Sequence, residues 1–191
     1  MSSDSEIVGM VLEETRERMG KALEHAAADF ASVRTGRASP ALVSKITVEY
    51  YGTPTPLQQL AGVHVADPRS LVITPYDRSA IQAVEKAIMA SDIGITPSND
   101  GQNIRLNIPP LTEERRKELI KVVRERAEHG RVSIRGIRRN AKEELDRQLK
   151  DGHVSEDDIK REEKRLDGLT QRFVQEIDEM LKRKEAELLE V

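Results

Sequence analysis

The sequence predicts an α+β protein in which a long three-helix bundle carries a small inserted α+β domain. Apolar residues recur every three or four positions in three long segments, whereas the stretch between the first two segments alternates with a period of two and contains several turn signals. Charged residues make up 34% of the 191 residues, and aromatic residues only 3%. This composition is typical of long helices with aliphatic seams and charged outer faces.

The first helix is predicted over residues 4–33. Its apolar side chains repeat at alternating steps of four and three, and only Thr15 interrupts the pattern. The seam consists of Val8, Leu12, Met19, Ala22, Ala26, Phe30 and Val33. Such a seam is typical of a coiled coil or an antiparallel bundle.

The second helix is predicted to begin after Thr112, whose hydroxyl can cap the first turn, and to end before Gly152, which suits a left-handed cap. A third helix is predicted to begin after Ser155, with Asp158 as the acid of a capping box. The second seam consists of Leu119, Val123, Ala127, Gly130, Ile134, Ile137, Ala141, Leu145 and Leu149. The third consists of Ile159, Leu166, Leu169, Phe173, Ile177, Met180 and Leu188. Because helices of this length are not stable alone in water, we expect the three seams to pack together.

A small α+β domain is predicted over residues 35–110, which leaves residues 1–34 and 111–191 for the bundle. Its limits are a stretch of turn formers at 35–40 and the double proline after Ile108, which lacks two backbone donors. Strands are expected at 45–50, 60–65, 71–74, 93–96 and 103–108, a helix at 79–91, and turns at 52–54 and 99–101. We expect Tyr50 and Tyr76 to be partly buried.

The two chain crossings between insert and bundle can act as a hinge, because only a few residues would have to change their dihedral angles. A fixed joint is the alternative. The hinge candidates are Arg34, Thr35, Gly36, Ile108, Pro109 and Pro110.

The distribution of charge points to a nucleic-acid partner, although the net charge of −3 suggests none. The insert is neutral, the first helix (1–34) carries −3 and the third segment (155–191) carries −4, whereas the second helix (112–150) carries +5. A row of bases without any acid occupies its middle, and consists of Arg131, Arg135, Arg138, Arg139 and Lys142. Like charges three or four positions apart repel, and a phosphate backbone is the usual reason for such a row.

Neutralisation by acids on the neighbouring helices is the alternative explanation for these bases. We expect it for Lys117, Lys121 and Arg124, which stand near several acids in the sequence, and expect nucleic-acid contact for the arginines from 131 to 139. Arginine suits this role because its planar guanidinium matches phosphate geometry.

No feature of the sequence indicates catalysis, a cofactor or a metal site. Cysteine is absent, the four histidines are scattered, and there is no phosphate-binding or nucleophile motif. No apolar run is long enough to span a membrane, and the acidic N-terminus does not resemble a signal peptide, so we expect a cytoplasmic protein. The tyrosines are too few to stack single-stranded RNA, so any RNA contact should use a helix face.

Several ordered motifs resemble the bacterial ribosome recycling factor family. The most specific are VRTGRASP at 33–40 and PPLTEERRKEL at 109–119, and VEYYG at 48–52, EKAI at 85–88 and NDG at 99–101 fit as well. The resemblance covers nearly the whole chain. One departure is Gly136, where the family usually has asparagine, and it puts a contact from that position in doubt.

The resemblance implies an L-shaped monomer of roughly tRNA size, with a β/α/β domain on a mobile joint. It implies binding to large-subunit ribosomal RNA at the subunit interface of the post-termination ribosome. Elongation factor G, hydrolysing GTP, would then push the small domain, split the ribosome and free mRNA and tRNA for a new round of translation. The factor itself would catalyse no covalent step. The implied RNA-facing residues are Arg116, Arg131, Arg135, Arg138 and Arg139. The competing class is a structural coiled-coil or oligomerisation protein that binds no RNA.

Overall fold

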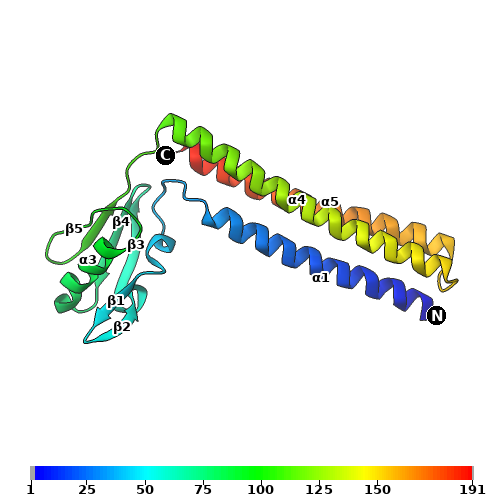
Figure 1. Ribbon diagram of the computed structural model, residues 1–191, viewed down its shortest axis with the longest axis horizontal. Coiled ribbons are helices and arrows are strands. Elements are labelled where there is room, and N and C mark those ends of the chain that lie inside the picture. Colours follow the sequence, from blue (N-terminus) through cyan, green and yellow to red (C-terminus); the bar gives the residue numbers. More distant parts are fainter. Residues whose placement is uncertain (1–2, 191) are drawn as a thin grey trace. The chain divides into compact units, whose positions relative to one another are not determined.

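A computed structural model describes residues 3–190, which form three long helices and a small mixed unit (Figure 1). The helices are α1 (Ser3–Ser32), α2 (Leu57–Leu60), α3 (Ile81–Ala90), α4 (Glu113–Lys150) and α5 (Glu156–Leu189), with 3₁₀ turns η1 (Pro40–Val43) and η2 (Arg78–Ala80). The strands are β1 (Thr47–Tyr50), β2 (Thr53–Pro56), β3 (Ala61–Asp67), β4 (Ser70–Pro75), β5 (Ser98–Asn99) and β6 (Ile104–Asn107). The predicted α+β class is therefore confirmed.

The chain divides into two compact units. The first holds α1, α4 and α5, and the second holds Arg34–Arg115 with all the strands. The unit boundaries fall just after α1 and inside the first turn of α4. No helix within residues 3–190 is long and apolar enough to cross a membrane.

Local interactions set both ends of α4 and the start of α5 at the residues predicted. The Arg115 N–H donates to the Thr112 hydroxyl at 3.1 Å, which caps the start of α4. After α4 the chain turns at Gly152 with a φ of 74°, a left-handed conformation that glycine adopts without strain. The Asp158 N–H donates to the Ser155 hydroxyl at 3.2 Å, and that hydroxyl donates to the Asp158 carboxylate at 2.7 Å. The acid of the predicted capping box therefore meets the hydroxyl, not the Ser155 backbone N–H.

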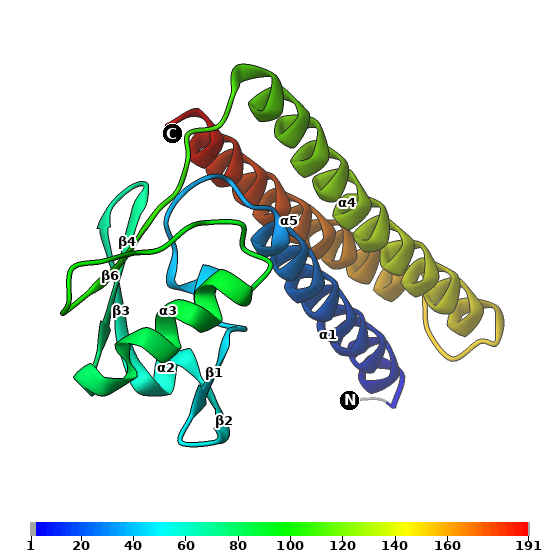
Figure 2. The same cartoon turned by 60° about the vertical axis from the view of Figure 1, so that its left-hand side comes forward.

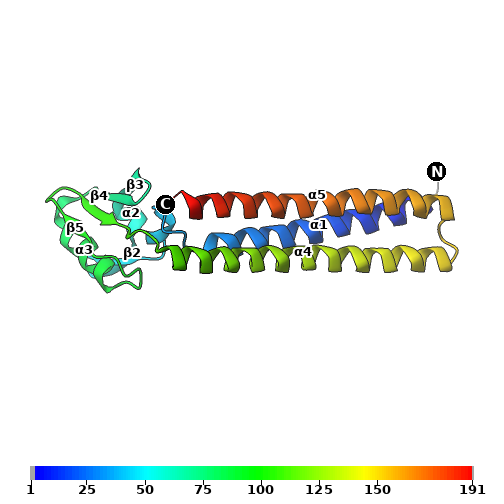
Figure 3. The same ribbon diagram turned by 90° about the horizontal axis from the view of Figure 1, so that it is seen from above.

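The three long helices run side by side and bury one shared seam (Figure 3). The predicted seam positions of α4 are buried, except Ile137 and Leu149, which are half-buried. Gly130 marks a close approach of all three helices, because a Cβ built there would lie 3.0 Å from Ile177 of α5 and 3.4 Å from Ala26 of α1. Thr15, which interrupts the first seam, is buried and donates its hydroxyl to the Val11 carbonyl at 2.7 Å.

The small unit is built on a four-stranded antiparallel sheet in the order β3-β4-β6-β5, with β1 and β2 forming a separate hairpin (Figure 2). Alternate residues of the central strands point into a core shared with α3, among them Leu71, Ile73, Ile104 and Leu106. The opposite face carries polar side chains such as His64 and Arg105, which flank Val72 across the strands. This alternation is what one-sided coverage of a sheet requires.

Three expectations for the small unit were wrong. Residues 93–96 form no strand, because Gly94 has a φ of 68°, which is incompatible with the extended backbone of a strand. The short strand β5 begins only at Ser98. The expected turn at 52–54 lies at Tyr51-Gly52, and residues 53–56 form β2. Tyr76 is 74% exposed, because it follows the end of β4 and lies beside Gly62 on the uncovered side of the sheet. Tyr50 is half-buried, as expected.

The segments proposed as hinge are well structured at several points. Gly36 has a φ of 74°, and a Cβ built on it would lie 3.0 Å from the Leu111 side chain. Thr35 and Ile108 are buried, and the Ile108 N–H donates to the Arg69 carbonyl at 2.8 Å. Arg34, Pro109 and Pro110 are exposed. Ile108 is therefore fixed to the small unit, which leaves the exposed prolines after it as the freer part of the second crossing.

Candidate nucleic-acid interface

The middle of α4 carries five bases within twelve residues, which we call the arginine face. Its members are Arg131, Arg135, Arg138, Arg139 and Lys142. The helical period places Arg131, Arg138 and Lys142 beside the buried seam of Gly130, Ile134 and Ala141, whereas Arg139 lies further round towards solvent. The seam thus fixes the rotation of α4 and decides which arginines face α5.

Three members of the arginine face form ion pairs with acids of α5. The Arg131 Nε lies 2.8 Å from Asp178 Oδ1, the Arg138 Nη2 lies 2.7 Å from Asp167 Oδ1, and the Lys142 Nζ lies 3.2 Å from Glu163 Oε1. The neutralisation expected for Arg124 is confirmed, because its Nε lies 2.6 Å from Glu185 Oε1. Neutralisation by the neighbouring helix therefore extends into the stretch where we expected RNA contact alone.

The other two members form no ion pair with α5 within residues 3–190. Arg135 contacts only Glu128 of its own helix, with 3.4 Å between Nη1 and Oε1, and its side chain is 55% exposed. Arg139 is exposed, and its side chain has no hydrogen bond or ion pair to any residue between 3 and 190. Arg139 is thus the member of the arginine face whose guanidinium is fully available to a ligand.

The ion pairs leave the arginine face able to bind anions. The side chains of Arg138 and Asp167 are 40% and 58% exposed, and ion pairs of this kind contribute only about 0–1 kcal/mol to stability. A phosphate can therefore replace the carboxylate at small cost. The more enclosed Arg131 is held more firmly: its hydrogen bond to Asp178 is the largest cause raising its pKa above the ordinary value, and a hydrogen bond to Glu128 acts in the same direction.

Arg116 does not join this group. It is half-buried near the start of α4, and the helical rise of 1.5 Å per residue separates it from Arg131 by about 22 Å along the axis. The acids of α5 that contact the arginine face were absent from the sequence-based site. The sequence does contain an indication of these pairs. In two antiparallel helices, residues at equal chain distances from the connecting turn lie opposite each other, and Arg138 and Asp167 are nearly equally far from the turn at 151–154.

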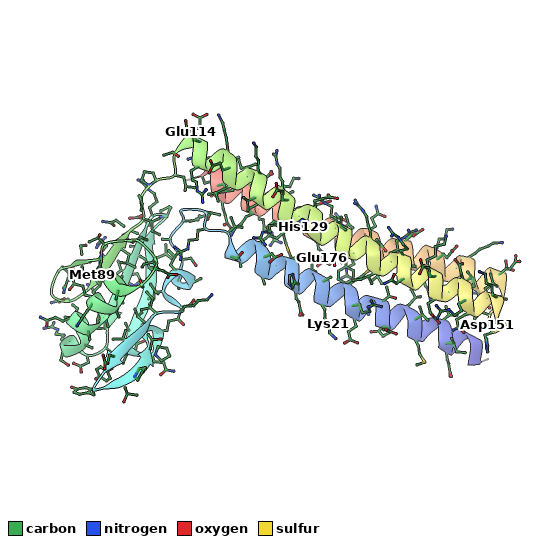
Figure 4. All side chains as sticks on the ribbon, viewed as in Figure 1. Lys21, Met89, Glu114, His129, Asp151 and Glu176 are labelled. Atoms are coloured by element: carbon green, nitrogen blue, oxygen red, sulfur yellow. The ribbon has the colours of Figure 1, made fainter. Side chains whose placement is uncertain are left out.

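A groove of about 500 Å³ lies between α1 and α4. It is lined by Lys21, Ala22, His25, Ala26, Asp29, His129, Gly130 and Ser133. Figure 4 shows Lys21 and His129 on the two helices. His25 lies 3.7 Å from Asp29. Among residues 3–190 no group of three or more histidine, aspartate or glutamate side chains could hold a metal ion.

A basic helix face on a three-helix unit is a charge pattern typical of nucleic-acid-binding proteins. The family model of ribosome recycling factor matches residues 26–189, and the chain therefore belongs to the ribosome recycling factor family, whose members are translation factors. The ribosome-recycling factor of Acidothermus cellulolyticus is 61% identical over 178 residues, which cover 93% of this chain and 96% of the relative. The ribosome-recycling factor of Salinispora tropica is 53% identical over 185 residues, which cover 97% of this chain and 100% of the relative.

Solved structures agree with this assignment. The chain matches the solution structure of a ribosome recycling factor with a TM-score of 0.76 and 38% identity, covering 96% of this chain and 98% of the other. It also matches a structure that describes the T. thermophilus ribosome recycling factor and the E. coli elongation factor G bound to the E. coli post-termination complex. In that case the TM-score is 0.66 and the identity 47%, over 95% of this chain and 98% of the other.

Proposed function

We propose that the protein binds the post-termination ribosome and, with elongation factor G and GTP, promotes its splitting into subunits and the release of mRNA and tRNA. The observation that carries this proposal is the family match over residues 26–189, together with relatives that are 53–61% identical over nearly the whole chain. A structural neighbour whose description names elongation factor G and the post-termination complex supports the choice of partners.

In this proposal the arginine face is the anchor on large-subunit ribosomal RNA. Arg139 and Arg135 contact phosphates first, and Arg138 and Arg131 can exchange their α5 carboxylates for phosphates at small cost. Arg116 contributes at the other end of α4. The protein acts by binding and by moving its small unit about residues 34–36 and 108–110, so it is no enzyme and needs no cofactor. We place it in the cytoplasm, where ribosomes work.

The alternative, a coiled-coil protein that associates through its seams, has less support. The central side chains of all three seams are already buried within a single chain: Met19 and Ile134 are 0% exposed and Leu166 is 1% exposed. Seams that are satisfied internally offer no surface for a second copy, which supports a monomer.

Subunit splitting followed by light scattering tests this function. Post-termination ribosomes are mixed with the protein, elongation factor G and GTP, and we expect a fall in scattering that needs all three. Two controls are a reaction without GTP and a reaction with the Arg139→Ala variant in place of the wild-type protein. In both, we expect light scattering to fall more slowly. Splitting that proceeds equally well without the protein, or none with it, would contradict the proposal.

A further inference from the structure

The tip of the β1–β2 hairpin presents an aromatic side chain at a position where the backbone disfavours it. β1 and β2 are joined by Tyr51 and Gly52 alone, and both residues have positive φ angles, 48° and 75°. A two-residue hairpin turn of this kind prefers asparagine, aspartate or glycine at its first position. Tyr51 is the one non-glycine residue with a positive φ among residues 3–190.

The same side chain is unusually exposed for its type. Tyr51 is 82% exposed, the highest value among the large hydrophobic residues that the structure describes. Because the ring lies in water, it contributes no stabilisation by burial. The left-handed backbone at Tyr51 adds strain to the folded state. Sparsely populated backbone conformations of this kind gather at functional sites.

The hairpin tip is held in place by contacts behind the ring. The rings of Tyr51 and Tyr50 meet edge to face, with their centroids 4.5 Å apart. The Tyr50 hydroxyl donates to Asp77 Oδ2 at 2.9 Å, and Asp77 Oδ1 accepts the Ser79 N–H at 2.9 Å just before α3. Tyr51 is therefore presented on a support anchored to the core of the small unit, and little side-chain freedom would be lost when it is bound.

The charge of the hairpin favours a protein over RNA as the partner. Residues 47–56 contain one charged side chain, the exposed Glu49, and no base. A surface that contacts RNA carries lysine or arginine for the phosphates, as the arginine face does, whereas rigid exposed tyrosines are typical anchors of protein interfaces. The hairpin also contains two prolines, Pro54 and Pro56, which add further rigid apolar surface.

We propose that Tyr51 is a contact residue for elongation factor G, which receives the ring in an apolar pocket with a cation facing Glu49. The inference rests on the proposed function, in which elongation factor G moves the small unit. A force applied to that unit needs a rigid point of contact, and the hairpin tip provides one that leaves the arginine face unused. Loss of the ring then weakens the action of elongation factor G and leaves ribosome binding by the bundle intact.

Tyr51→Asn and Tyr51→Phe separate this role from a structural one. Asparagine suits the left-handed turn better than tyrosine, so the Tyr51→Asn protein should fold and melt at an equal or higher temperature. Phenylalanine keeps the ring. The matched control is Tyr76→Asn, which removes another exposed tyrosine of the small unit, 74% exposed, from a different surface.

The experiment titrates elongation factor G in the splitting assay and measures binding to ribosomes without it. We expect Tyr51→Asn to raise the half-maximal concentration of elongation factor G about tenfold, as is typical for loss of an interface anchor. Tyr51→Phe and Tyr76→Asn should behave like the wild type, and binding without elongation factor G should not change.

Each other result overturns the inference in a recognisable way. Wild-type splitting by Tyr51→Asn would show that elongation factor G does not use the ring, while the proposed function would stand. Weaker binding of Tyr51→Asn to ribosomes alone would assign the ring to the ribosome. An equal defect in Tyr76→Asn would indicate a general disturbance of the small unit. Absence of splitting by the wild-type protein would remove the proposed function and the inference together.

Discussion

Removal of the Asp167 carboxylate should strengthen binding to ribosomes, which is an unusual result for a substitution at a site. Asp167 pairs with Arg138 across the α4–α5 interface, and both side chains are substantially exposed. In Asp167→Asn the guanidinium loses its ion pair and keeps at most a weaker, neutral hydrogen bond, so it becomes more available to phosphate. One negative charge also disappears from the surface that approaches the RNA.

The size of the effect follows from the value of an exposed ion pair, about 0.2–1 kcal/mol. Because 1.4 kcal/mol corresponds to a tenfold change, the affinity should rise by up to about fivefold. The dependence of the binding constant on salt should steepen by up to about one unit, since Arg138 then contacts phosphate without competition from Asp167. Stability should change little for the same reason.

Equilibrium binding to large ribosomal subunits across a salt titration measures both quantities. The matched control is Glu14→Gln on α1, which removes the same charge from an exposed acid that has no ion pair within residues 3–190. We expect Glu14→Gln to bind with the wild-type slope. Equal affinities and slopes for Asp167→Asn and the wild type would refute the reasoning, because Arg138 would then have no phosphate to contact.

Three further predictions follow from the backbone and from one carboxylate. Gly136→Ala should raise the free energy of unfolding by about 1 kcal/mol in urea denaturation, because alanine favours helix and the new Cβ would meet no described atom within 4 Å beyond its chain neighbours and the adjoining helix backbone. Unchanged or lower stability would contradict this. Gly36→Ala and Gly52→Ala should each lower the free energy of unfolding by roughly 1–2 kcal/mol, because both glycines have a φ near 75°. Only Gly36→Ala should also slow ribosome splitting, since the Leu111 side chain beside it must move. A normal splitting rate for Gly36→Ala would count against a hinge there. Hydrogen bonds from Ser79 and, to a smaller extent, from Tyr50 hold the pKa of Asp77 below its ordinary value. The ionised Asp77 therefore stabilises the fold above about pH 4, and this stabilisation is lost as the pH falls through the lowered pKa. Thermal melts at several pH values should show that the melting temperature of Asp77→Asn falls less in acid than that of the wild type.

Features that depend on neighbouring residues in the chain could be predicted from the sequence. The long helices follow from apolar spacing, and the cap at Thr112 and the turn at Gly152 follow from local hydrogen bonding and from glycine's conformational freedom. The seams were also predicted, and most of their positions are buried. The half-buried exceptions are Leu12, Ala22, Ile137, Leu149, Leu169, Phe173 and Met180.

Features that depend on how distant segments pack could not be predicted in the same way. The exposure of Tyr76 depends on which face of the sheet remains uncovered. The missing strand at 93–96 has a local cause instead, the positive φ of Gly94, which the alternation of side chains does not reveal. Within the candidate site, the arginines of α4 could be found by their spacing. Their pairing with Asp167 and Asp178 does not follow from spacing along α4 alone, because it also depends on the register between α4 and α5.

The register of α4 and α5 also alters how the charge of the arginine face should be understood. Counted along α4 it is strongly basic, yet carboxylates on α4 and α5 compensate most of it. Arg139 lies outside this compensation within residues 3–190. We therefore expect Arg139 to have more effect on RNA binding than the other members of the arginine face.

The most direct test of this claim is the salt dependence of binding to large ribosomal subunits by wild type, Arg139→Ala and Arg18→Ala, the last of which removes an exposed arginine from α1. For Arg139→Ala we predict an affinity lower by about 1–3 kcal/mol and a salt slope reduced by about one unit, with Arg18→Ala like the wild type. Equal affinities and slopes for all three proteins would contradict the account.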